Sequence, residues 1–93
     1  MENKFKLTAT VDEIGELVQI RRTHKPDLFK VVLTLRTDDM QILYPEIRNT
    51  GLKILEREGI VVGSKVEVEF TFQGTEKNEK KYNNILIQSI RRI

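Results

Sequence analysis

The chain has 93 residues and a mass of 10.9 kDa, which is enough for one domain with a single hydrophobic core, residues 1–93. The absence of cysteine excludes disulfide bridges, thiolate metal sites and cysteine nucleophiles. No apolar run approaches the roughly 20 residues that cross a bilayer. Met1 to Thr10 lack the apolar centre of a signal peptide, so we expect a soluble, cytoplasmic protein.

The charges are unevenly distributed, although the net charge is only +2. The stretch from Arg21 to Arg36 has a net charge of +4, and so does the stretch from Lys77 to Arg92. The rest of the chain therefore sums to −6. Two basic stretches in an otherwise acidic chain indicate where an anionic partner would be attracted.

Alternation of apolar and polar residues with a period of two dominates the chain and predicts strands. The first strand is long, and Gly15 predicts a bend with a bulge in it. Pro45 cannot donate to a sheet, so the third strand should end there or lie at an edge. The predicted strands cover residues 5–20, 29–36, 40–47, 65–72 and 82–90.

A short helix is predicted between the third and fourth strands. Asn49 or Thr50 can cap its start, and Gly59 would end it. Leu52 and Leu55, three residues apart, would face inward and close the bottom of the fold.

The predicted order is β-β-β-α-β-β, an all-β domain with one short helix. This pattern is typical of the OB-fold, a five-stranded Greek-key barrel. Ligands of this fold lie across the second and third strands, between the loops that join strands one to two and four to five. Here those loops are residues 21–28 and 74–81, and both basic stretches begin in or beside them. Charge and periodicity thus predict a basic groove at the same place.

The chemistry of such a groove favours single-stranded nucleic acid, because Lys and Arg bind phosphates and aromatic rings stack on bases. All four phenylalanines fall on apolar faces and are expected in the core. Tyr44 and Tyr82 are candidates for stacking, with burial as the alternative for each. The candidate nucleic-acid-binding residues are Arg21, Arg22, His24, Lys25, Lys30, Arg36, Tyr44, Lys77, Lys80, Lys81 and Tyr82.

Each of these features also has a plainer interpretation. The lysines of residues 77–81 can form a solvated hairpin, and His24 can be an ordinary polar loop residue. Asp38 and Asp39 are adjacent at a turn, where they would serve turn geometry rather than converge on a metal ion. The sequence contains no Ser–His–acid set, glycine-rich phosphate loop or metal-ligand cluster, so we expect no enzyme, no cofactor and no metal site.

The C-terminal third carries a family resemblance. Its sequence GSKVEVEFTFQGTEKNEKKYNNILIQSI, from Gly63, resembles bacterial single-stranded-DNA-binding proteins: a Gly-polar turn, alternating valines, a charged hairpin, then Tyr-Asn and an apolar strand. Phe70 stands where that family often has glycine, and Lys77 where its hairpin commonly has an aromatic residue. The end at Arg91-Arg92-Ile93, without an acidic tail, is more similar to the compact branch that includes primosomal replication protein N. The resemblance implies a role in DNA replication and a homodimer or homotetramer.

Three hypotheses follow from the residues and the resemblance. The first is a non-enzymatic OB-fold that binds single-stranded DNA, or RNA, through backbone charge. The second is an OB-fold protein-interaction module that serves assembly without binding nucleic acid. The third is a domain that binds an oligosaccharide or another small molecule. Salt dependence distinguishes the first from the others, because only phosphate contacts release counterions.

Overall fold

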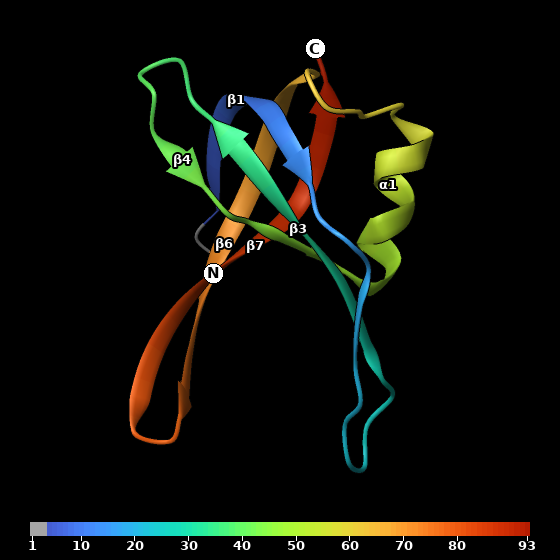
Figure 1. Cartoon of the computed structure of the whole chain (residues 1–93), viewed down its shortest axis with the longest axis vertical. Coiled ribbons are helices and arrows are strands. Elements are labelled where there is room, and N and C mark those ends of the chain that lie inside the picture. Colours follow the sequence, from blue (N-terminus) through green and yellow to red (C-terminus); the bar gives the residue numbers. More distant parts are fainter. Residues whose placement is uncertain (1–3) are drawn as a thin grey trace.

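A computed structural model describes residues 4–93. It shows strands of two to thirteen residues around a small core, with one helix on its side (Figure 1). The elements in chain order are β1 (Phe5–Ile14), β2 (Val18–Ile20), β3 (Leu28–Arg36), β4 (Ile42–Leu43), β5 (Glu46–Arg48), a 3₁₀ turn η1 (Asn49–Gly51), α1 (Leu52–Arg57), β6 (Lys65–Lys77) and β7 (Lys80–Arg92).

The strands close into a barrel. Their order in the sheet is β1-β6-β7-β5-β3-β2, and β1 also pairs with β3, which joins the two ends of the sheet. All pairs are antiparallel except β5 with β7, which meet at Glu46 and Leu86. Because β1 with β2 and β4 with β5 are the two halves of the first and third predicted strands, the architecture is the five-stranded OB-fold barrel that the sequence predicts.

The first predicted strand is divided into β1 and β2 around Gly15. The bend is where the sequence places it, but the bulge lies three residues earlier, at Asp12, where the β1–β3 register shifts. The Gly15 amide donates a hydrogen bond to the Val32 carbonyl oxygen at 2.9 Å. A Cβ atom at position 15 would lie 2.7 Å from that same oxygen, so only glycine allows this approach.

The third predicted strand is interrupted at Pro45, as the missing N–H requires. Residues 44–45 separate β4 from β5, and the Pro45 carbonyl still accepts a hydrogen bond from the Leu33 amide at 2.9 Å. The strand begins later than predicted, because Met40 has a φ of 67° and belongs to the turn that precedes it.

The helix is shorter than predicted, and its predicted cap is wrong at Asn49. The Asn49 side chain accepts a hydrogen bond from the Phe29 amide at 3.1 Å and so ties η1 to β3 instead of capping the helix. The side chain of Thr50, the other predicted cap, lies outside what the structure describes. Leu52 and Leu55 pack against the core as predicted, and Ile54 joins them.

The core is mostly aliphatic, and among the residues described Phe70 is the only buried aromatic ring. The prediction that the other phenylalanines are buried is wrong: Phe72 is 55% exposed, Phe5 46% and Phe29 37%. Phe72 shares a face of β6 with Phe70, but β1 begins at Phe5, opposite Phe70. No third strand therefore covers Phe72. The fully buried side chains include Val11, Leu33, Leu35, Ile47, Val66 and Val68.

The predicted loop over residues 74–81 is wrong as well, since this segment is paired sheet. β6 and β7 pair as far as Lys77 with Lys80, and Asn78 and Glu79 alone form the turn. Both turn residues have positive φ angles, 53° and 65°, as a two-residue hairpin turn of the type I′ kind requires. The β6–β7 ribbon, residues 73–84, extends beyond the barrel (Figure 1). Within residues 4–93, no helix is long and apolar enough to cross a membrane.

Candidate nucleic-acid interface

The two basic segments extend from the same end of the barrel. Figure 1 shows the β2–β3 connector, residues 21–27, at the lower right and the β6–β7 ribbon at the lower left. In the sheet order, β7, β5 and β3 follow one another, so β5 and the first half of β3 lie between the two segments. They project on either side of this surface and share no hydrogen bond or ion pair in the part of the chain described.

The connector exposes its four predicted residues to solvent. The Arg22 Nε atom donates a hydrogen bond to the Pro26 carbonyl oxygen at 2.8 Å, which fixes the base of that side chain. His24 has a φ of 65°, so it serves to turn the backbone. No carboxylate of residues 4–93 lies within 4.0 Å of Arg21, Arg22 or Lys25. The connector therefore offers three uncompensated cations.

The ribbon divides its predicted residues between two faces. Lys77 pairs with Lys80, and Tyr82 lies two residues from Lys80 along β7, so strand alternation places all three on one face. Lys81 lies on the other face, opposite Glu76. Tyr82 is half exposed, which leaves its ring accessible. The sequence-based prediction groups these four residues in one site. The strand pairing instead places three of them on one face of the ribbon and Lys81 on the other.

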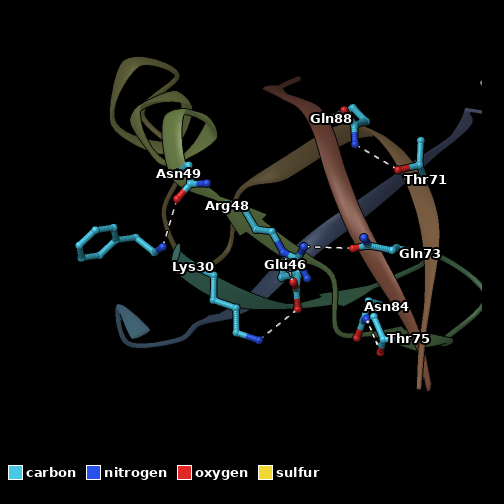
Figure 2. A network of polar contacts seen from close by, with 10 residues as sticks. Lys30, Glu46, Arg48, Asn49, Thr71, Gln73, Thr75, Asn84 and Gln88 are labelled. Carbon is cyan, nitrogen blue, oxygen red and sulfur yellow. Dashed lines mark hydrogen bonds and ion pairs between the residues drawn. The ribbon is translucent and has the colours of Figure 1, made fainter. Parts of the chain in front are cut away.

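The ribbon face that carries Lys77, Lys80 and Tyr82 continues onto the outer face of β5. Gln73 and Asn84 belong to the same face, since they pair two residues further down the ribbon. The Gln73 Oε1 atom accepts a hydrogen bond from Arg48 Nη1 at 3.1 Å (Figure 2).

Arg48 in turn pairs across the sheet with Lys30 of β3. The Lys30 and Arg48 side chains converge on the side chain of Glu46, a residue that is only 7% exposed. Lys30 Nζ lies 3.4 Å from Glu46 Oε2, and Arg48 Nε bonds the other oxygen (Figure 2). A buried carboxylate needs such partners, because it has lost its water. The three groups together keep one positive charge.

Sequence reasoning missed Glu46, Arg48 and Gln73. Glu46 and Arg48 flank the inward-facing Ile47, so alternation alone could have placed both on the outer face beside Lys30. Gln73 carries no such signal, since only the pairing register brings it to Arg48.

Arg36 and Tyr44 lie away from the connector. β3 is nine residues long; it starts at the connector and ends at Arg36, where Arg36 Nε lies 3.1 Å from the Asp12 carboxylate. The charge of Arg36 is thus compensated at the far end of the strand. Tyr44 is 65% exposed, so the alternative of burial is wrong, and its ring is accessible on the segment between β4 and β5.

The two adjacent aspartates diverge, as turn residues do. Asp38 lies 3.4 Å from Lys65 Nζ, whereas Asp39 accepts a hydrogen bond from the Thr37 hydroxyl. Within residues 4–93, no three His, Cys, Asp or Glu side chains gather in a way that could hold a metal ion.

Two exposed phenylalanines, Phe5 and Phe72, form a cluster with the buried Phe70 where the ribbon leaves the barrel. The ring centroids of Phe5 and Phe72 lie 5.2 Å apart, and Phe70 lies 5.8 Å from Phe5 and 5.6 Å from Phe72. Phe72 meets both other rings edge-to-face, and Phe5 is stacked on Phe70; both arrangements are favourable for aromatic pairs. The cluster presents flat apolar surface that the alternation pattern assigns to the core.

Comparison with known proteins gives a likeness among solved structures. Searches with protein-family models and among curated proteins found no match. Among solved structures, the chain is similar to the dimeric N-terminal domain of the PriB protein from Thermoanaerobacter tencongensis. The two share 17% identity with a TM-score of 0.56, and the match covers 98% of this chain and 96% of that one. The likeness shows a shared OB-fold over the whole domain.

Proposed function

We propose that this protein binds single-stranded nucleic acid, DNA in the first place, as a non-enzymatic OB-fold domain. The observation that carries the proposal is the continuous outer face from Lys77, Lys80 and Tyr82 through Arg48 to Lys30. This face lies across the strands that OB-folds use for ligands, and the connector flanks its other side.

The charges on this surface suit contacts to phosphates. The connector carries three cations without a carboxylate partner in residues 4–93, namely Arg21, Arg22 and Lys25, and this face of the ribbon carries two, Lys77 and Lys80. Exposed cations bind a phosphate backbone without reading its sequence.

The rings suit stacking better than the sequence pattern indicates. Five of the six aromatic side chains are exposed, whereas the pattern places four in the core. Each base stacked on a ring contributes about 1–3 kcal/mol. Tyr82 lies on the proposed face itself, and Tyr44 lies on the segment that leads into β5.

The test is a salt titration with a labelled oligo-dT. We expect the logarithm of the binding constant to fall linearly with the logarithm of salt concentration, by about 0.7 for each phosphate contacted. Six contacts would give a slope of about −4. Fluorescence anisotropy of the labelled oligo-dT measures the binding constant at each salt concentration, and these values give the slope. An oligosaccharide ligand would bind independently of salt, and flat anisotropy at low salt with micromolar protein would favour the protein-interaction module instead.

Replacing Glu46 by Gln should strengthen binding. Glu46 neutralises part of the charge of Lys30 and Arg48, and the amide would release one positive charge while its oxygen still accepts a hydrogen bond from one of them. One added phosphate contact should tighten binding about fivefold at 0.1 M salt and make the slope more negative by about 0.7.

The matched control is Glu76→Gln, which removes an exposed carboxylate on the opposite face of the ribbon. It should change the affinity less than Glu46→Gln. Weaker binding by Glu46→Gln would contradict the expectation and show that the carboxylate positions Arg48 for the ligand.

We also propose that copies of this chain associate, as a homodimer or homotetramer. The similar PriB domain is dimeric, and this barrel leaves apolar side chains exposed on β2 and on the Phe5 and Phe72 cluster. Covering such surface favours association. The mass in solution, by sedimentation equilibrium, gives the number of copies.

A further inference from the structure

A cavity of about 430 Å³ lies between α1 and the strands β5 and β7. Three cations line it: Arg48 from β5, and Lys53 and Arg57 from α1. Lys53 and Arg57 are four residues apart on the helix and therefore share a face. Neither has a carboxylate of residues 4–93 within 4.0 Å. Glu46 is the one acidic residue that lines the cavity, and it is already bonded to Lys30 and Arg48.

The cavity also has apolar walls. Ile54 of α1 and Leu86 and Ile87 of β7 line it, and all three are half-buried. Leu86 lies on the outer face of β7, two residues from the polar Asn84. An outward-facing leucine on an otherwise polar face of β7 thus adds an apolar wall to the cavity that the cations line.

We propose that this cavity is a subsite for one nucleotide, with the base against Ile54 and Leu86 and the phosphate at Lys53 and Arg57. Cations above an apolar wall match a nucleotide, which joins an anionic phosphate to a flat base, and the volume is within the range of small-ligand sites. The nucleotide can be one unit of a nucleic-acid strand or a free nucleotide.

The connection to the proposed interface runs through Arg48. This side chain lines the cavity and also bonds Gln73 at the base of the ribbon. A nucleic-acid strand that crosses from the ribbon over β5 would therefore reach α1. This path rests on the proposed function, because it assumes that the protein binds a nucleic-acid strand. It extends the course of that bound strand beyond the surface between the connector and the ribbon. This continuity favours a nucleotide over an acidic peptide as the occupant.

The first experiment removes the helix cations. We expect the double variant Lys53→Gln with Arg57→Gln to bind oligo-dT about 25-fold more weakly at 0.1 M salt, with a slope less steep by about 1.4. The matched control is Lys65→Gln with Arg91→Gln, which removes the same two residue types at the other end of β6 and β7. The control should retain the wild-type slope. An unchanged slope in the helix variant would overturn the subsite and leave the proposed function standing.

The second experiment follows the methyl resonances of Ile54, Leu86 and Ile87 by NMR. Oligo-dT and free dTMP should each shift them, dTMP at higher concentration. Shifts with dTMP but no binding of oligo-dT would keep the subsite and overturn the proposed function. Shifts with a hexaglutamate peptide, but with neither nucleotide probe, would overturn the nucleotide assignment in favour of an acidic peptide.

Discussion

Neutralising Arg21, Arg22, Lys77 and Lys80 together should weaken oligo-dT binding about 600-fold at 0.1 M salt. Removing one phosphate contact lowers the binding constant about fivefold at that salt concentration, and the slope should become less steep by about 2.8 for the four together. None of the four has a carboxylate partner in residues 4–93, so their substitution by Gln breaks no ion pair there. Anisotropy titrations at several salt concentrations measure both quantities.

Two double variants, each with half of these substitutions, show whether one DNA strand contacts both the connector and the ribbon. The connector pair, Arg21→Gln with Arg22→Gln, and the ribbon pair, Lys77→Gln with Lys80→Gln, should each weaken binding of a 20-nucleotide dT about 25-fold. A dT oligomer too short to reach both segments should be sensitive to one pair only. Losses of affinity that depend on base sequence would contradict recognition through the backbone, because phosphates carry no sequence information.

Gly15→Ala should lower the free energy of unfolding by about 2 kcal/mol, because the new Cβ would lie 2.7 Å from the Val32 carbonyl oxygen. That oxygen belongs to the backbone of β3 and accepts the Gly15 hydrogen bond, so it cannot move without disturbing the barrel. For a domain of this size the melting temperature should fall by about 8–16 °C. Thermal and urea unfolding, followed by circular dichroism, measure the change.

The control is Gly74→Ala in the ribbon. A Cβ there would have its nearest neighbours at 4.0 Å, and the backbone φ is not positive. Alanine should be neutral or stabilise by about 0.5 kcal/mol, since it restricts the unfolded chain. Equal effects of the two substitutions would mean that the close approach of β1 to β3 at Gly15 is absent.

The strands and their order could be predicted because the signal for them is local. Side chains alternate between the faces of a strand, so Val66 and Val68 between Lys65, Glu67 and Glu69 reveal a half-buried strand without any knowledge of its neighbours. Pro45 likewise interrupts a strand through its own missing N–H. The OB-fold barrel follows from the number and order of these elements.

The burial of the phenylalanines could not be predicted in the same way. Alternation tells which face of β6 carries Phe72, and that face is indeed the one with Phe70. It does not tell where the neighbouring strand begins. β1 starts at Phe5, so Phe72 extends beyond the covered part of the sheet and stays exposed.

The candidate site was predictable in part. The connector and its cations are local features that the sequence reveals, whereas the polar residues of the ribbon indicate a loop and hide the pairing of β6 with β7. The link between Arg48 and Gln73 joins residues 25 positions apart in the chain. Such a contact depends on the register of two strand pairs, which no short stretch of sequence specifies.

The sequence by itself determined which segments form strands, where the chain must turn, and which short stretches carry unbalanced positive charge, since each depends on a residue and its immediate neighbours. The tertiary structure alone decided which of those charges stay unpaired, which rings remain exposed, and that Lys30, Glu46 and Arg48 share one surface with the ribbon. These outcomes depend on strand register and on where each strand ends. Both are set by the packing of the whole barrel around a small core.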